Sequence, residues 1–456
     1  ALKPDVISYN AATSACEKGG QWQRALELLE GMPQRALKPD VISYNAATSA
    51  CERGGQWQRA LELLEGMSQR ALRPDVISYS AATSACEKGG QWQRALELLE
   101  GMSQRALTPN VISYNTATSA CEKGGQWQRA LELLEGMPQR ALTPNVISYS
   151  AATSACEKGG QWQRALELLE GMPQRALTPD AISYSAATSA CERGGQWQCA
   201  LDLLERMSQR ALTPNVISYN AATSACEKGG RWQRALELLE GMSQRALRPN
   251  VISYSAATSA CERGGQWQRA LELLEGMSQR ALRPNVISYS SATSACERGG
   301  QWQCALELLE RMSQRALKPD VISYNAATSA CDKGGQWQRA LELLEGMPQR
   351  ALTPNVISYS ATTSACERGG QWQRALKLLE GMSQRALTPN VISYSAATSA
   401  CEKGGQWQRA IELLERMLWC GLEPDENGYS AAIGACAAGA QLQRALDLLE
   451  RMPLLT

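Results

Sequence analysis

One 35-residue unit recurs thirteen times along the chain, and this period is the feature that most constrains its fold. With Val6 as position one, the unit reads VISYNAATSACEKGGQWQRALELLEGMPQRALKPD, and its copies begin at residues 6, 41, 76, 111, 146, 181, 216, 251, 286, 321, 356, 391 and 426. A period in this range is typical of stacked units, none of which buries its own apolar face alone. The sequence therefore predicts a repeat array rather than several separate domains.

Each unit carries the pattern of two helices. The segment SYNAATSACEK predicts a first helix that Ser8 caps and that Gly19 and Gly20 end. The segment QWQRALELLEGM predicts a second helix with one apolar face and one charged face. The segment PQRALKPD is the connector, because Pro39 disfavours a continuing helix. The expected fold class is all-α: a right-handed α-solenoid, or superhelix, of stacked helix-turn-helix hairpins.

The register of the unit divides the chain into three segments. Residues 1–5 are the tail of a preceding repeat, residues 6–425 hold twelve regular repeats, and residues 426–456 form an atypical thirteenth. Because the chain opens on Ala1 inside a repeat tail, we expect it to be a piece of a longer protein. The thirteenth repeat is predicted to be a C-terminal cap, since four of its residues leave the pattern together: Glu426, Asn427, Gly428 and Ala438.

The composition argues against several classes of function. The formal net charge is +1, which favours no bulk polyanionic partner. No His is present, so the usual general base and the commonest metal ligand are missing. We therefore expect no catalytic residue, no metal, no cofactor and no small-molecule substrate, and the protein is not expected to be an enzyme. No apolar run is long enough to span a bilayer, so no membrane partner is expected.

Cysteine and tryptophan mark the repeat. Thirteen of the sixteen Cys occur once per copy, from Cys16 to Cys436, and no C-x-x-C pair exists. They are interpreted as small core residues in a reducing compartment. Twelve of the thirteen Trp begin the second helix in its apolar register, which favours packing over a ladder for stacking bases. Trp419, in the connector LWCGLEPD, has no explanation from the pattern.

The period of 35 residues, the opening VISYN, the second helix ALELLEGM and the closing KPD together resemble the pentatricopeptide repeat family over essentially the whole chain. The resemblance implies an RNA-binding array in which each repeat reads one base of single-stranded RNA. It further implies a role in organellar RNA metabolism (stabilisation, processing, splicing or translation) in a mitochondrion or chloroplast, although no targeting segment is visible. The alternative is a protein–protein interaction scaffold of the tetratricopeptide type.

Two positions alternate while their neighbours hardly change. Position five is Asn or Ser, and position thirty-five is Asp or Asn; the two residues of one repeat are called here a reader pair. By resemblance these are the RNA base-specifying residues: Asn10 with Asp40, Asn45 with Asp75, Ser80 with Asn110, Asn115 with Asn145, Ser150 with Asp180, Ser185 with Asn215, Asn220 with Asn250, Ser255 with Asn285, Ser290 with Asp320, Asn325 with Asn355, Ser360 with Asn390, and Ser395 with Asp425.

The chemistry of the reader pairs predicts an RNA sequence. Ionised Asp only accepts hydrogen bonds, which suits the ring N–H of uracil and guanine, whereas Asn also donates, which suits the ring nitrogen of cytosine and adenine. At position five, Asn reaches a pyrimidine and Ser leaves room for a purine. The family's pairing preferences agree, and with the N-terminal repeat at the 5′ end the predicted target is 5′-UUACGACAGCAG-3′.

A structural interpretation of the same two positions stays open. Asn, Ser and Asp are all common in first helical turns and in tight turns, because their side chains cap backbone groups there. Other positions, such as thirteen and twenty-eight, vary among copies as well. Variation alone therefore does not separate base reading from capping. All four combinations do occur at the reader pairs, which favours reading.

An invariant apolar residue adjoins each reader pair. Position two is Ile in twelve copies, and the resemblance implies that it wedges against the base, so that successive repeats sandwich it. The alternative is an ordinary core isoleucine between repeats. The RNA base-sandwiching candidates are Ile7, Ile42, Ile77, Ile112, Ile147, Ile182, Ile217, Ile252, Ile287, Ile322, Ile357 and Ile392.

Position thirteen carries one cation per repeat in the same twelve copies. Regular spacing suits one phosphate contact per nucleotide. The alternative is a cation that stabilises the C-terminus of the first helix through the helix dipole. The RNA phosphate candidates are Lys18, Arg53, Lys88, Lys123, Lys158, Arg193, Lys228, Arg263, Arg298, Lys333, Arg368 and Lys403.

Overall fold

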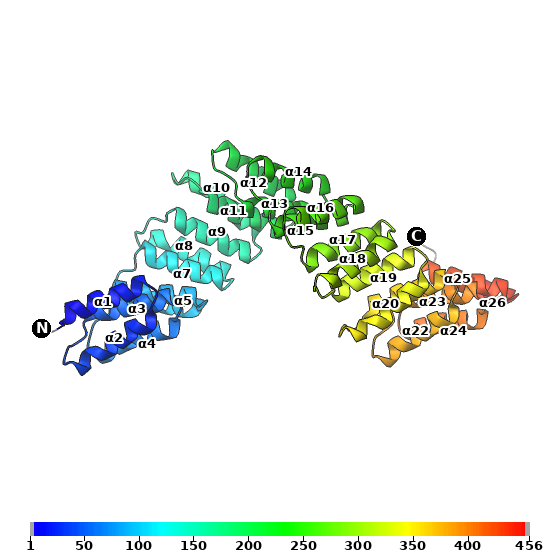
Figure 1. The fold of residues 1–456 in the computed structure, drawn as a ribbon, viewed down its shortest axis with the longest axis horizontal. Helices are drawn as coiled ribbons and strands as arrows, with labels where there is room; N and C mark the ends of the chain where they lie inside the picture. Colours follow the sequence, from blue (N-terminus) through cyan, green and yellow to red (C-terminus); the bar gives the residue numbers. More distant parts are fainter. Residues whose placement is uncertain (1–3, 452–456) are drawn as a thin grey trace. The chain divides into compact units, whose positions relative to one another are not determined.

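The computed structural model describes residues 4–451, which fold into 26 α-helices without a β-strand in that range. The chain divides into two compact units, Ala1–Gly229 and Gly230–Thr456, and each is described by itself. Within each unit the repeats are helical hairpins, and consecutive hairpins stack on one another (Figure 1). The all-α solenoid predicted from the sequence is confirmed.

Every hairpin has the same bounds within the repeat. The first helix covers positions one to thirteen and the second helix positions seventeen to twenty-nine, except for the shorter last helix. The helices are α1 (Val6–Lys18), α2 (Trp22–Gln34), α3 (Val41–Arg53), α4 (Trp57–Gln69), α5 (Val76–Lys88), α6 (Trp92–Gln104), α7 (Val111–Lys123), α8 (Trp127–Gln139), α9 (Val146–Lys158), α10 (Trp162–Gln174), α11 (Ala181–Arg193), α12 (Trp197–Gln209), α13 (Val216–Lys228), α14 (Trp232–Gln244), α15 (Val251–Arg263), α16 (Trp267–Gln279), α17 (Val286–Arg298), α18 (Trp302–Gln314), α19 (Val321–Lys333), α20 (Trp337–Gln349), α21 (Val356–Arg368), α22 (Trp372–Gln384), α23 (Val391–Lys403), α24 (Trp407–Trp419), α25 (Glu426–Ala438) and α26 (Leu442–Arg451).

The first helix starts two residues earlier than the sequence suggested. Its N-cap is Asp5 rather than Ser8, and the Asp5 carboxylate accepts a hydrogen bond from the backbone N–H of Ser8. The same arrangement recurs at position thirty-five of each repeat, whose side chain caps the first helix of the next repeat, as Asp40 does for α3. An acceptor at this place satisfies a backbone N–H that has no partner inside the helix. The expectation that Ser8 is the cap was wrong.

The second helix runs two residues further than expected. In α2 it includes Pro33 and ends at Gln34, and the backbone N–H of Leu37 then bonds to the Met32 carbonyl. The turn places Ala36 in the left-handed region with φ of 59°, and ten further connectors hold an Ala the same way. That conformation costs roughly 1–2 kcal/mol for a residue with a Cβ. In the atypical connector after α24, Gly421 takes this place with φ of 71°.

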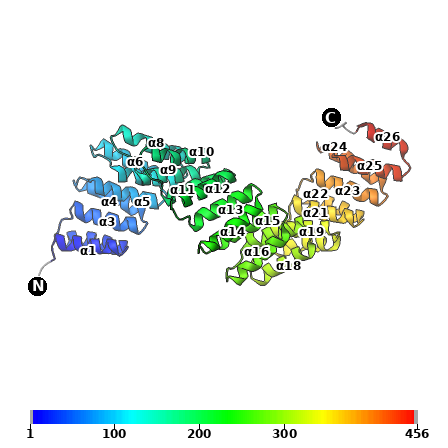
Figure 2. The same cartoon turned by 90° about the horizontal axis from the view of Figure 1, so that it is seen from above.

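Small side chains allow the first helices to pack closely. Ala47, Ala50 and Cys51 of α3 are fully buried, and their counterparts in the regular first helices from α5 to α23 are buried as well, whereas those in α1, the first helix of the chain, are not. Neighbouring first helices of each unit, such as α1 and α3, lie side by side (Figures 1 and 2). Within each unit, successive second helices of the described residues keep their Cα atoms more than 8 Å apart. The first helices therefore form one continuous face in each unit, and the second helices stand apart on the other.

Tryptophan joins one repeat to the next. Trp267, at the start of α16, lies against the backbone of Gly299, where a Cβ would come within 2.3 Å of the indole Cδ1. Its ring is half-buried rather than fully inside the core. The second glycine of the same pair, Gly300, adopts φ of 67° and so needs glycine for a different reason. The packing interpretation of these Trp is confirmed, whereas Trp419 is almost fully exposed.

The repeat cysteines belong to the core. From Cys51 to Cys436, each repeat cysteine is buried and unpaired with another Cys. Burial raises the pKa of the Cys121 thiol to about 11, so that this group stays protonated at neutral pH.

Between residues 4 and 451 no helix has the length and apolar character needed to cross a membrane.

We predict that one substitution, Gly→Ala, has opposite effects at two sites of the same region. Gly299→Ala forces the Trp267 ring to move and should destabilise the protein by about 1–3 kcal/mol. Gly276→Ala, inside α16, meets nothing closer than Tyr254 at 3.8 Å and should stabilise it by about 0.5–1 kcal/mol through helix propensity. Urea unfolding of both variants measures the difference. A stabilising Gly299→Ala would contradict the proposed fit of Trp267.

Candidate nucleic-acid interface

The two residues of a reader pair lie next to each other in space. In the first repeat the Asn10 Nδ2 donates to the Asp40 Oδ1 over 3.2 Å, although thirty residues separate them. Asn45 makes the same bond to Asp75 at 3.1 Å. The pair forms because position five lies in the second turn of one first helix while position thirty-five caps the adjacent first helix. The structure thus brings together the two positions that the sequence singled out.

Serine-type reader pairs keep the same arrangement with a shorter reach. The Ser150 Oγ lies 3.5 Å from the Asp180 Oδ1 and donates to the Val146 carbonyl over 2.8 Å. In repeat eleven the Ser360 Oγ lies 3.3 Å from the Asn390 Oδ1. The shorter side chain at position five therefore leaves more space beside the residue at position thirty-five.

The position-two isoleucines point to solvent. All twelve are exposed, with exposed fractions between 59% and 75%. An isoleucine whose role was to fill the core between repeats would be buried, so that alternative was wrong. One exposed Ile per repeat stands beside each reader pair and offers an apolar surface to a ligand.

One cleft on the first-helix face collects the predicted residues of a single repeat. It encloses about 470 Å³ among α21, α23 and α25, and is lined by Ile392 together with both members of a reader pair, Ser395 and Asp425. Asn427, at position two of the next repeat, forms part of the same wall. The cleft therefore has the expected composition of a base site: one apolar wall, one polar wall and two hydrogen-bonding groups.

The position-thirteen cations are tied to carboxylates that the sequence analysis did not consider. Lys158 lies 3.0 Å from Glu122, which is position twelve of the preceding repeat, and Lys333 lies 2.6 Å from Glu297. Such pairs recur from Arg53 with Glu17 to Lys403 with Glu367, at 2.6–3.5 Å. The cations remain roughly 40% exposed, as for Lys158 at 37%. A phosphate would approach them in competition with this glutamate.

Asp332 breaks the regular pattern of these ion pairs, because the other regular repeats carry the longer Glu at position twelve. Its Oδ1 lies 3.2 Å from the Arg368 Nε, yet this buried oxygen accepts no hydrogen bond. Burial raises the pKa of Asp332 to about 6, while the nearby Arg368 acts in the opposite direction. The carboxylate is thus held in an unfavourable environment at neutral pH.

Sequence reasoning missed the serine at position three. Ser43 donates to the Asn10 Oδ1 over 2.6 Å and is within 2.8 Å of the Asp40 Oδ1, so it contacts both residues of the preceding reader pair. The signal was present, because position three is Ser in the same twelve copies that keep Ile and the cation. The sequence pattern explains this serine as the cap of its own helix, and that explanation does not predict a contact with the preceding repeat.

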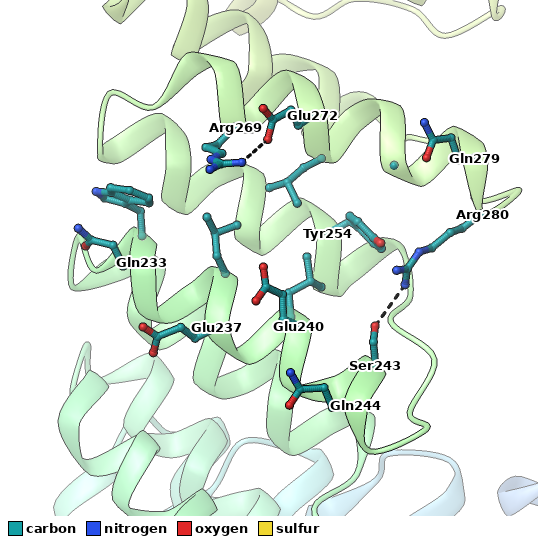
Figure 3. Close-up of a pocket in the computed structure, with 15 residues that line it drawn as sticks. Gln233, Glu237, Glu240, Ser243, Gln244, Tyr254, Arg269, Glu272, Gln279 and Arg280 are labelled. Carbon is teal, nitrogen blue, oxygen red and sulfur yellow. Dashed lines mark hydrogen bonds and ion pairs between the residues drawn. The ribbon is translucent and has the colours of Figure 1, made fainter.

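A second type of groove lies on the opposite face, between the second helices. The one between α14 and α16 encloses about 680 Å³ over Leu236, Leu239 and Leu273 (Figure 3). At its rim Arg269 pairs with Glu272 of the same helix at 2.7 Å, and Arg280 reaches across to donate to Ser243 of α14 at 3.3 Å. None of the predicted RNA-contacting residues lines this groove. Its lining residues recur nearly unchanged in every regular repeat.

Within residues 4–451, no group of three His, Cys, Asp or Glu side chains is placed to hold a metal ion.

Comparison with known families gives a consistent result along the chain. A family model described as the pentatricopeptide repeat domain matches residues 1–54, 62–123, 97–159, 132–193, 167–231, 203–265 and 237–299. A model of the single PPR repeat matches residues 42–71, and the pentacotripeptide-repeat region of PRORP matches residues 289–454. No curated protein matches the sequence.

Solved structures share the fold at low identity. The crystal structure of the pentatricopeptide repeat protein PPR10 from maize is 21% identical, with a TM-score of 0.62 over 99% of this chain and 74% of that one. PPR10 in complex with an 18-nucleotide psaJ RNA element is 20% identical, with a TM-score of 0.49 over 99% and 80% of the two chains. Yeast Rmd9p with a 16-nucleotide target RNA is 9% identical, with a TM-score of 0.34 over 95% and 87%. At such identities the likeness to PPR10 concerns the fold.

We predict that neutralising Asp332 stabilises the protein in a pH-dependent way. Because the folded state raises the pKa of this group from 3.8 to about 6, its contribution to stability is complete below pH 3.8 and is lost as the pH rises through 6. Asp332→Asn removes the ionisable group and therefore this pH-dependent decrease in folding stability. The unfolding temperature of the variant should therefore exceed that of the wild type at pH 8, and the excess should shrink toward pH 5. An excess that is constant with pH would contradict the raised pKa.

Proposed function

Because the chain belongs to the pentatricopeptide repeat family, we propose that it binds single-stranded RNA in a sequence-specific manner. Each of the twelve reader pairs reads one base, and the proposed target is 5′-UUACGACAGCAG-3′. The same family membership is the basis for proposing a mitochondrial or chloroplast transcript as the natural ligand, with a role in its stabilisation, processing, splicing or translation.

The observation that carries this proposal is the cleft that unites Ile392, Ser395 and Asp425. A base lying in it meets an apolar wall on its face and hydrogen-bonding groups on its edge. Stacking against an apolar wall tolerates every base, so that contact supplies affinity. The edge contacts differ from repeat to repeat, so they supply selectivity. This division fits an invariant isoleucine beside a variable reader pair.

The distribution of variation favours RNA over the protein-scaffold alternative. The grooves between the second helices have a nearly constant lining, so they carry no information that differs from repeat to repeat. The residues that alternate lie on the first-helix face instead: position five alternates in side-chain length, and position thirty-five alternates between an acceptor-only carboxylate and an amide that also donates. A surface that recognises a sequence of different bases needs this kind of variation.

The proposal is tested by exchanging one reader. The wild-type protein is expected to bind the target RNA more tightly than the same RNA with A at the fifth base, by about 1–3 kcal/mol, since Ser150 and Asp180 form the fifth reader pair. Asp180→Asn should reverse this preference, because it replaces an acceptor by a donor of nearly equal size. Fluorescence anisotropy with the two labelled RNAs measures both ratios. An absence of wild-type binding to either RNA would count against RNA recognition itself.

The position-thirteen cations are proposed to contact phosphates, and salt dependence tests this role. Lys158→Ala should lower the slope of log affinity against log salt concentration by about 0.7, the value for one phosphate contact on single strands. Arg164→Ala is the matched control, because Arg164 also pairs with a glutamate, Glu167 at 2.7 Å, but extends from the second helix. Equal slopes for wild type and Lys158→Ala would assign Lys158 a purely structural role.

A further inference from the structure

We propose that the serine at position three of each repeat is a positioning residue that determines which atoms the preceding reader pair presents to a base. This inference rests on the proposed RNA-binding function. Its evidence is a hydrogen-bond network that recurs across the junction between successive repeats. The serine is fully or almost fully buried in this network; Ser183, for example, is 0% exposed. It therefore acts on the base only through the reader pair.

The first element of the network fixes one side-chain oxygen of position thirty-five. The Asp180 Oδ1 accepts from the backbone N–H of Ser183 over 2.8 Å and from the Ser183 Oγ over 2.7 Å. The Asn215 Oδ1 accepts from the same two groups of Ser218, at 2.9 and 3.0 Å. The backbone N–H requires an acceptor, so the Nδ2 of an asparagine is excluded from this place. Asp and Asn are consequently held in the same orientation.

The second side-chain atom of position thirty-five is thereby left for a ligand. Asp180 is only half-buried, and within residues 4–451 its Oδ2 accepts no hydrogen bond. The corresponding atom of Asn215 is the Nδ2, which donates. Because the serine fixes the other oxygen, the exchange of Asp for Asn changes one presented atom from acceptor to donor. Without the serine hydroxyl, the side-chain amide of an asparagine at position thirty-five loses one hydrogen bond. Its oxygen and nitrogen can then exchange places more readily by rotation of the amide group.

The second element of the network orients position five. Where this residue is Asn, the serine hydroxyl bonds to its carbonyl oxygen, as Ser148 does to the Asn115 Oδ1 at 2.6 Å, and the Asn115 Nδ2 then donates to Asn145. Where position five is Ser, the two hydroxyls bond to each other, as Ser150 and Ser183 do at 2.8 Å. One buried hydroxyl therefore contacts both members of the reader pair in either type of repeat, with its single proton shared between them.

The twelfth reader pair lacks this serine, because the repeat that follows it has glycine at position three. This residue is Gly428, whose backbone N–H still donates a hydrogen bond to the capping Asp425 Oδ1 at 2.9 Å. The Ser395 Oγ instead bonds directly to the same oxygen at 2.5 Å. A Cβ at Gly428 would lie 3.2 Å from both Asp425 and Ser395, the two side chains that a serine hydroxyl reaches in the other repeats. We therefore expect the twelfth base to be read with less selectivity than the fifth or the ninth, which have the same Ser–Asp pair.

Removal of one hydroxyl tests the proposal. Ser183→Ala keeps the backbone cap and removes the side-chain bonds to Ser150 and Asp180. The ratio of affinities for RNA with G and RNA with A at the fifth base should fall about fivefold, the size expected for one net hydrogen bond. The ratio at the ninth base, read by Ser290 and Asp320, should stay unchanged and serves as the internal reference. Anisotropy titrations with four RNAs give both ratios.

Two further variants make the outcome specific. Ser103→Ala, at the end of a second helix where Ser103 accepts from Arg140, should change neither ratio. Gly428→Ser should raise the ratio of affinities for RNA with G and RNA with A at the twelfth base. A variant that merely folds less well would not show such a gain in selectivity. If the wild type shows a preference at the fifth base that Ser183→Ala retains in full, the positioning role is overturned while RNA reading stands. If the wild type shows no preference at any base, the proposed function itself fails.

Discussion

The hydrogen bond between position thirty-five and the next first helix is the constraint on which the rest depends. It satisfies a backbone N–H at the start of each helix and, at the same time, fixes the side chain next to position five of the preceding repeat. Helix capping and the proposed base reading, which appeared as competing explanations from the sequence, are therefore compatible, because they use different atoms of the same residue. One oxygen stabilises the fold, and the other atom is exposed to a ligand.

The close packing of the first helices makes this arrangement regular. Fully buried Ala and Cys side chains keep these helices near one another, and Trp267 against Gly299 shows how each second helix contacts the next repeat. The position-two isoleucines lie outside this core, and all twelve are exposed at the surface. A stiff core of small residues thus presents one apolar side chain and one reader pair at each repeat.

Much of this could be predicted from the sequence because the period gave the number, order and type of the helices. The limits appeared wherever two residues far apart in the chain decide the geometry. Ser8 was expected to be the cap because periodicity does not show which of two polar residues, three positions apart, caps the helix, and Asp5 has that role. The pairing of Lys158 with Glu122 was likewise invisible, since it joins position thirteen to position twelve of another repeat.

The location of each reader pair across a junction between two repeats has a consequence for the gene as well as for the protein. Near-identical units are prone to unequal crossing-over, and an exchange point between the codons for positions five and thirty-five joins the first half of one pair to the second half of another. Such an event changes the number of repeats and can create a new reader pair, without disturbing the buried contacts that the units share. Under the proposed function, the array can therefore acquire a new RNA target through recombination alone.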